Sequence, residues 1–245
     1  MNYMVFDLEF NQVFNFSKDS TKVADPRCPF EIIDIGAVKL DESLSAVEKF
    51  DSLIKPRIYT RIHPMVRRIT GITREALKNA KTFKTVYGSL VKFMSNVDAL
   101  CVWGGSSDIR ELYRNAEYYG LDTSIIPKKY IDVQHYADIS LKQTKGANIA
   151  LSSAVEAFDI PVEQRFHDAF NDAFYTAEVF KKLGSNDITP EVYHFTTEKR
   201  KGKRKTINDD MLIKQFDNMF HRKMTPEEQN IIKMAYRMGR TNQFS

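Results

Sequence analysis

The first third of the chain alternates short apolar runs with polar segments, a pattern typical of β-strands. It predicts strands over residues 3–10, 30–40 and 46–54, and "EIIDIGAVKL" in the second run is rich in β-branched residues. Between the first two strands, "NQVFNFSKDSTKVADPRCP" has the Asn, Ser, Asp and Pro content of a long loop. Such a loop is either functional or a loose insertion, and the sequence leaves both possibilities open.

The middle of the chain changes to helical spacing interrupted by short apolar runs. The pattern predicts helices over 83–94, 106–120, 151–158 and 168–183, with strands over 98–103 and 129–134 between them. Three strands followed by alternating helices and strands predict an α/β fold in which helices flank a mixed sheet.

The composition changes beyond Gly184. Six basic residues fall among positions 199–205, so residues 185–205 are interpreted as a basic linker after a domain at 1–184. Residues 206–245 are expected to form a helical appendage. It could pack on the core, recruit a protein partner or dimerise, and packing on the core is the first expectation. Its two helices are indicated by an apolar face and by a capping box: Leu212, Phe216, Met219 and Phe220, then Thr225 with Glu228.

Bulk composition restricts the class of protein. The chain is 42% hydrophobic and 28% charged, enough to bury a core, and it has no apolar run long enough to span a bilayer. No secretory signal is visible, and Cys28 and Cys101 are too few for a disulfide framework or a cysteine metal cage. We expect a cytoplasmic protein without a membrane partner. A net charge of +4 permits a polyanionic partner without requiring one.

Two carboxylates interrupt the first apolar run, "MVFDLEFNQ". Asp7 and Glu9 are two positions apart, so on a strand their side chains share one face, while Phe6, Leu8 and Phe10 share the other. Taken alone, the pair fits the solvated side of an edge strand as well as it fits a functional site.

Asp108 and Asp172 have ordinary explanations when each is considered alone. Asp108 lies where a strand passes through a Gly-Gly-Ser-Ser turn into a helix, a position typical of helix capping. Asp172 lies early on the helix predicted over 168–183, where a solvated face is the simpler interpretation.

Five segments together resemble one family. "FDLEFN", "WGGSSD" and "HDAFND" resemble the three motifs of DnaQ-like, DEDD-type 3′–5′ exonucleases, in the same order and at the same spacing. "IIDIGAVKLD" and "LIKPRIYTRIHPMVRRITGIT" resemble that family's connecting segments. The spacing of His167, Ala169 and Asp172 is similar to the histidine subtype (DEDDh), and the whole pattern is most similar to its Eri-like and KapD-like branch. The resemblance covers roughly residues 1–183 and implies a ribonuclease H-like fold.

The resemblance implies that Asp7, Glu9, Asp108 and Asp172 gather into one metal-binding cluster. Two carboxylates about 4 Å apart repel by roughly 4 kcal/mol at an effective dielectric constant of about 20. Four such groups do not stay ionised together without cations, and oxygen ligands select Mg²⁺ or Mn²⁺ rather than zinc. Two ions are implied, with Asp7 as the expected bridging ligand.

The remaining site assignments also follow from the resemblance. His167 is the expected general base, since a pKa near 6.5 suits proton transfer at neutral pH. Phe10 and Asn11 are expected beside the terminal nucleotide, although the family commonly has Thr at the position of Asn11. The spacing favours Asp172 over Asp168 as the motif acid, and Trp103 is expected to pack in the core.

The leading hypothesis is a divalent-metal-dependent 3′–5′ exonuclease that releases 5′-mononucleotides from single-stranded 3′ ends. Similarity to the Eri-like branch favours RNA over DNA. Six Lys or Arg residues and no acid lie from Lys55 to Arg74, which is either a nucleic-acid contact or ordinary solvation. Two alternatives remain: a regulatory protein that binds an RNA end or another protein with little turnover, and a DNA polymerase proofreading exonuclease.

Overall fold

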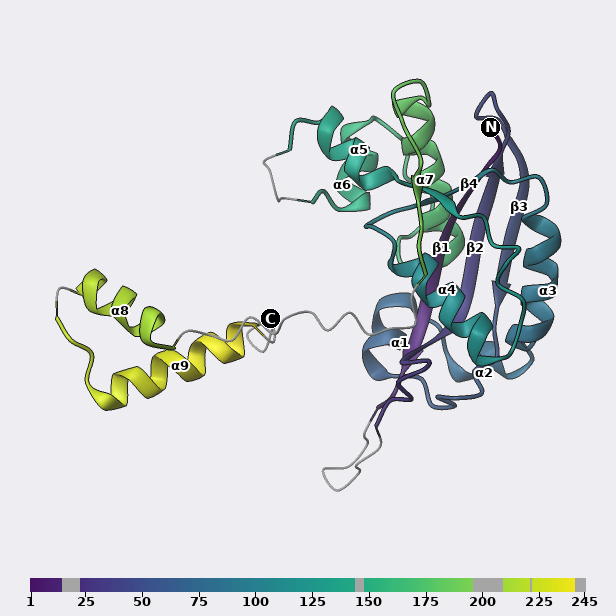
Figure 1. Cartoon of the computed structure of the whole chain (residues 1–245). Helices are drawn as coiled ribbons and strands as arrows, with labels where there is room; N and C mark the ends of the chain where they lie inside the picture. Colours follow the sequence, from purple (N-terminus) through teal and green to yellow (C-terminus); the bar gives the residue numbers. More distant parts are fainter. Residues whose placement is uncertain (15–22, 144–147, 196–208, 221, 241–245) are drawn as a thin grey trace. The chain divides into compact units, whose positions relative to one another are not determined.

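The computed structural model describes residues 1–14, 23–143, 148–195, 209–220 and 222–240 (Figure 1). The chain divides into two units, Met1–Phe195 and Thr196–Ser245. Each unit is described by itself. In the described ranges, no helix combines the length and the apolar character that a bilayer span requires.

A mixed sheet with strand order β3-β2-β1-β4-β5-β6 forms the centre of the first unit. The N-terminal strands β1 (Tyr3–Gln12), β2 (Phe30–Leu40) and β3 (Ala46–Leu53) pair antiparallel. The next two, β4 (Ala99–Val102) and β5 (Lys129–Asp132), continue the sheet parallel to β1. The predicted fold class, a ribonuclease H-like mixed sheet flanked by helices, is confirmed.

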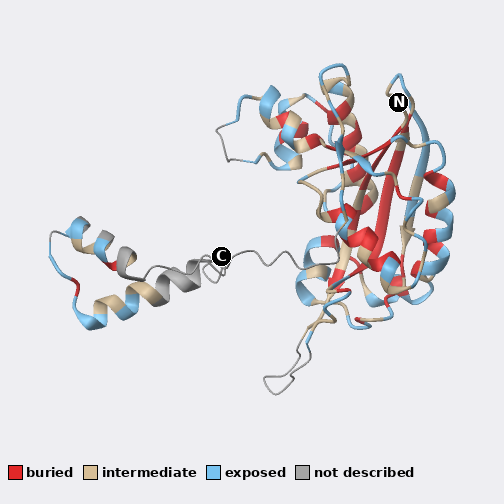
Figure 2. Ribbon diagram, viewed as in Figure 1, coloured by how far each residue is buried: buried red, intermediate tan, exposed pale blue. Residues whose placement is uncertain are grey.

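Helices cover both faces of this sheet, because side chains along β1 alternate between two cores. Met4, Phe6 and Leu8 pack with α3 (Phe83–Phe93) and α4 (Ser107–Tyr118). Tyr3 and Val5 pack on the opposite face with α5, α6 and α7, and Figure 2 shows the buried residues concentrated along β1 and β2. These three helices are Val133–Ser140, Leu151–Ala157 and Ala169–Leu183.

Three helices were not predicted from the sequence. Two short ones, α1 (Pro64–Thr70) and α2 (Arg74–Lys78), follow β3, and α5 begins directly after β5. The strand predicted over 129–134 therefore ends at Asp132. All three are at most eight residues long, which is too short for the apolar spacing of a helix to repeat.

The first unit extends beyond the predicted boundary at 184. Strand β6 (Glu191–Val192) pairs antiparallel with β5, and the rings of Tyr193 and Phe195 pack against Tyr113 of α4. Residues 185–195 are therefore part of the first unit rather than of a linker. The basic run at 199–205 lies outside the described residues.

The second unit contains α8 (Asp209–Phe220) and α9 (Pro226–Arg240), as predicted. The capping box is confirmed: the Thr225 N–H donates to Glu228 Oε2 at 2.8 Å, and the Glu228 N–H donates to Thr225 Oγ1 at 3.3 Å. Arg222 also donates to the Glu228 carboxylate, and these bonds lower the pKa of Glu228 to about 2. Packing of this unit on the core stays a prediction.

Candidate active site

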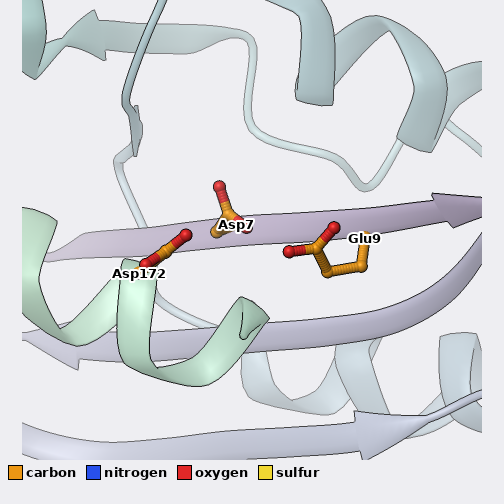
Figure 3. A group of neighbouring side chains, drawn as sticks. All are labelled: Asp7, Glu9 and Asp172. Atoms are coloured by element: carbon orange, nitrogen blue, oxygen red, sulfur yellow. The ribbon is translucent and has the colours of Figure 1, made fainter. Parts of the chain in front are cut away.

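Three of the four predicted acids meet on the face of the sheet that α7 covers. Asp7 and Glu9 come from β1, and Asp172 comes from the first turn of α7 (Figure 3). One carboxylate oxygen from each lies within 4.8 Å of the other two, and all three residues are half-buried. The alternation predicted for β1 is confirmed, since Phe6 and Leu8 are buried in the core on the opposite face.

Gly36 allows α7 to reach this position. It pairs with Asp7 across β1 and β2, and a Cβ atom placed on it would collide with the backbone of Ala169 and Phe170. The missing side chain lets the first turn of α7 lie directly on β2, which brings Asp172 beside Asp7. Sequence analysis did not identify Gly36 as a positioning residue, because nothing local marks a helix that approaches from 130 residues away.

Asp108 reaches the site from the other side of the sheet. It lies in the first turn of α4, which packs on the face opposite α7, after a turn in which Gly104 and Gly105 have φ of +81° and +86°. Asp108 is outside the group within 4.8 Å, but it is buried, and its charge contributes to the raised pKa values of Asp7 and Glu9. It is therefore a neighbour of the three acids in this structure and not a member of their group.

His167 precedes α7 in an unusual backbone conformation. Its φ is +62°, the left-handed region, and its backbone N–H donates to both carboxylate oxygens of Asp172, at 3.1 and 3.3 Å. Strained backbone of this kind persists where surrounding contacts hold it, often at functional sites. The residue is exposed. Asp168 instead caps α7 by accepting from the Asn171 N–H, in agreement with its exclusion from the motif.

Burial raises the pKa values of all four acids, and neighbouring negative charges add to the shift. Burial is the largest cause in each case. It raises the pKa of Asp7 well above its usual range, and the charges of Asp108, Asp172 and Glu9 raise it further. The pKa of Glu9 rises to about 8 and that of Asp108 to about 7. That of Asp172 rises to about 6, although the His167 N–H bond opposes the shift. At neutral pH the cluster therefore needs either protons or a cation.

Asp34 is a fifth acid, which sequence analysis did not identify. It pairs with Glu9 across β1 and β2, is only 4% exposed, and accepts hydrogen bonds from the backbone N–H groups of Ile35 and Ala169. Its Oδ1 has no hydrogen-bond partner among the described residues, and burial, with the charge of Asp51, raises its pKa to about 7. The signal was present, since Asp34 interrupts "EIIDIGAV" as Asp7 interrupts the first strand.

Asn11 and Glu31 form a second polar cluster, one step further along the same strand pair. They are cross-strand partners, and both are buried. The Asn11 amide donates to the Tyr59 and Arg61 carbonyls at 2.7 and 3.0 Å, and its oxygen accepts from the His63 N–H at 2.9 Å. The structure gives this side chain a positioning role, while its contact with a substrate stays a prediction.

The Glu31 carboxylate accepts three backbone N–H groups of the same loop. The Arg57 N–H donates at 2.6 Å, Ile58 at 3.0 Å and Tyr59 at 2.8 Å. Together with Asn11, it fastens the loop after β3 to the end of the strand that carries Asp7 and Glu9. We call Asn11 and Glu31 the loop clamp.

The other residues singled out in the sequence have structural positions. Phe10 is half-buried, and its ring lies 6.3 Å from that of Phe30 in an edge-to-face contact. Trp103 packs against the core on the α7 face, as expected. His63 caps α1 by accepting from the Met65 N–H at 3.1 Å.

The donor set of the acid cluster fits a hard divalent cation. Asp7, Glu9 and Asp172 offer carboxylate oxygens, and this group contains no His or Cys. Such ligands suit Mg²⁺ or Mn²⁺. A cation also removes the repulsion that raises their pKa values.

The sequence of this chain is similar to parts of known DNA polymerase III proteins. The chain is 32% identical over 193 residues to a PolC-type DNA polymerase III of Thermotoga petrophila, a match that covers 75% of this chain and 13% of that protein. It is 27% identical over 164 residues to the DNA polymerase III subunit epsilon of Rickettsia prowazekii, covering 65% and 68% of the two chains. This chain therefore spans only a small part of the PolC-type protein.

The fold resembles a solved nuclease domain, that of 3′hExo, described as a DEDDh family member bound to rAMP. The TM-score is 0.64 at 17% identity, over 80% of this chain and 97% of that one. The resemblance to DEDDh-type exonucleases is confirmed, while the closeness to the Eri-like and KapD-like branch stays a prediction. A family model described as an exonuclease, of the RNase T type, matches residues 4–180. Because this match covers most of the chain, the protein belongs to that exonuclease family.

Proposed function

We propose that this protein is a divalent-metal-dependent 3′–5′ exonuclease that hydrolyses single-stranded 3′ ends to 5′-mononucleotides. The observation that carries the proposal is the meeting of Asp7, Glu9 and Asp172 within 4.8 Å, beside buried Asp108. A stable core has no use for four carboxylates with raised pKa values, whereas a site for cations and phosphate does.

Asp7, Glu9, Asp108 and Asp172 would hold the ions, two Mg²⁺ or Mn²⁺. When bound, such ions supply Lewis-acid stabilisation of the charge that develops on the phosphate oxygens. The protein contributes a preorganised set of oxygens from two rigid elements, β1 and α7. Asp34 supports that set, because it accepts from the Ala169 N–H at the start of α7.

His167 would take the proton of the attacking water at an imidazole nitrogen. Its exposure leaves the ring accessible, and the bond from its backbone N–H to Asp172 fixes where the residue lies relative to the acids. Histidine is the side chain most often used as a general base in catalysis. Phe10 and Asn11 would lie beside the terminal nucleotide.

RNA is the substrate we favour, with DNA second. The solved nuclease domain that this fold resembles was bound to rAMP, which supports a ribonucleotide end. The two sequence relatives are named as DNA polymerase components, which supports the proofreading alternative. That alternative requires a polymerase partner, and the second unit is a candidate surface for one. A regulatory binding role with little turnover is third, and a cytoplasmic location stays a prediction.

A labelled-strand assay tests the proposal. Matched RNA and DNA single strands, labelled at the 3′ or the 5′ end, are incubated with Mg²⁺, Mn²⁺ or EDTA. We expect 5′-mononucleotides released from the 3′ end with metal only, and faster from RNA. Cleavage that survives EDTA, or that begins at the 5′ end, would contradict the proposal. Binding without turnover would favour the regulatory role, and co-purification of a polymerase would favour proofreading.

A further inference from the structure

A basic pocket lies between the loop after β3 and helix α2. Its volume is about 550 Å³, and it is lined by four cationic side chains and one acid, Glu75. The cations are Lys55, Arg57, Arg74 and Lys78. The rest of the lining is Thr60 and three apolar side chains: buried Pro56 and Leu77, and half-buried Ile62. We call this the α2 pocket.

The positive charge of the α2 pocket exceeds what its single acid, Glu75, can offset, because four cations line the same pocket. In the part of the chain that the structure describes, none of its four cations forms an ion pair, whereas Lys39, Arg114 and Lys181 each pair with a glutamate. The Lys55 ammonium donates to the Lys78 carbonyl at 2.9 Å, which keeps it at the pocket. Four cations gathered around a single carboxylate attract an anion with more than one negative oxygen.

The wall of the pocket is fixed to the strand that carries the acids. Arg57 is held by its backbone N–H to Glu31, and the loop clamp extends this attachment to His63. Asn11 lies two residues beyond Glu9, about 6.6–6.8 Å along the same strand. The pocket and the acid cluster are therefore parts of one rigid framework, which suits two contacts with a single ligand.

We propose that the α2 pocket binds an internal nucleotide of the strand whose 3′ end lies at the acid cluster. The phosphate would lie among the four cations, and the sugar or base would lie against Pro56, Ile62 and Leu77. A free phosphate would use the charges but not the apolar surface. This inference rests on the proposed function, and it adds a second contact that makes activity depend on strand length.

The test removes two exposed cations, in the double variant Arg74→Gln, Lys78→Gln. Its matched control is Lys128→Gln, Lys129→Gln, which removes the same charge beside β5, on the far side of the sheet from β3. Affinity for a 12-nucleotide single strand is measured in EDTA, where the strand is not cut, at several salt concentrations. Turnover with Mn²⁺ is measured on the same strand and on a dinucleotide.

We expect the α2 pocket variant to bind the 12-nucleotide strand about 10-fold more weakly. The slope of log affinity against log salt should fall by up to about 0.7, since a single strand contributes about 0.7 for each neutralised phosphate and the pocket holds one phosphate. Turnover of the dinucleotide should be unchanged, because a dinucleotide has no internal nucleotide for the pocket to bind. The control should match the parent in every measurement.

Two results would overturn the inference: unchanged strand affinity and salt slope in the α2 pocket variant, or equal losses in this variant and the control. Failure of the proposed function is distinct, because the parent would then cleave neither substrate with Mn²⁺. The binding measurements still decide the role of the pocket in that case.

Discussion

Two polar clusters lie on neighbouring positions of the same strand pair, and they differ in how their polar groups are satisfied. In the loop clamp, the Glu31 carboxylate accepts backbone N–H groups, and the Asn11 amide is used on both its donor and acceptor sides. In the acid cluster, carboxylates face one another, and neighbouring Asp34 has one oxygen without a hydrogen-bond partner among the residues that the structure describes. A buried polar group without a partner is costly. The loop clamp is therefore complete within the chain, whereas the acid cluster requires a ligand.

The largest expected effect comes from Asp7→Asn, the central acid. Exonuclease activity should fall by about 10³-fold or more. Lewis-acid stabilisation of the transition state is worth several kcal/mol, and each 1.36 kcal/mol added to the activation free energy lowers the rate about tenfold. The metal-free variant should nevertheless be more stable than the parent at pH 8, because one repelling charge is gone. Steady-state kinetics and denaturant unfolding measure both effects. Glu117→Gln, an exposed acid on α4, is the control. If the metal-free variant is less stable than the parent, Asp7 has a structural role like that of the loop clamp residues.

Loss of the proposed general base should be next in size. His167→Asn keeps a residue type that tolerates positive φ but lacks a nitrogen that accepts a proton near pH 7. We expect kcat to fall by about 10²–10⁴-fold, with loss of the acid limb of its pH profile. His135→Asn, on the exposed side of α5, is the control. If His167→Asn retains full activity and His167→Ala does not, the residue serves the backbone and not proton transfer.

Glu31→Gln tests the other side of the comparison. An amide in place of this carboxylate presents N–H groups to backbone N–H donors, so the free energy of unfolding should fall by about 1.5–3 kcal/mol. Dinucleotide turnover below the unfolding transition should stay within about tenfold of the parent, because no reacting group is removed. The prediction fails if stability is unchanged, or if turnover falls as far as in Asp7→Asn.

The raised pKa values of the acid cluster predict how stability depends on pH. The pKa of Glu9 is about 8 and those of Asp108 and Asp34 about 7 in the folded state, above their unfolded values near 4. Between these limits the folded state binds more protons than the unfolded state, so stability falls as pH rises from about 4 to 8. In EDTA, Tm should therefore be several degrees lower at pH 8 than at pH 5.5, and Mn²⁺ should stabilise more at pH 8. A metal-free Tm that rises across this range would contradict it.

The smallest expected effect comes from Asp34→Asn. Asp34 lies between the acid cluster and the start of α7. Asn can still accept from the Ala169 N–H, so the helix should stay in place while one charge disappears. We expect roughly a tenfold loss in kcat or in Mn²⁺ affinity, typical of a residue that acts through the ligands. Asp34→Ala removes the acceptor as well and should lower stability. Equal behaviour of the two variants would show that the hydrogen bond to α7 does not matter.

Asp34 also shows where sequence reasoning stopped. An acid inside an apolar strand indicates the site at Asp7, and the same signal is present in "EIIDIGAV", where the surrounding β-branched residues predict only a strand. Asn11 was interpreted through the family pattern as a substrate contact, and the structure shows its amide bonded to a loop about 50 residues away. Contacts between residues so far apart leave no local periodicity in the sequence. The sequence therefore identifies the individual residues but not which residues they contact.

The sequence by itself determined the order of strands β1–β5 and of helices α3, α4, α6 and α7, the shared face of Asp7 and Glu9, and the capping boundary of α9, because each depends on residues a few positions apart. It also contained the motifs that place the chain in the exonuclease family. Only the tertiary structure decided that Asp172 joins Asp7 and Glu9 while Asp108 lies slightly apart, because α7 and α4 approach from opposite faces of the sheet. Only the tertiary structure showed that Gly36 leaves room for α7 to pack on β2. It also showed that Asn11 and Glu31 attach the loop that lines the α2 pocket to the strand that carries Asp7 and Glu9.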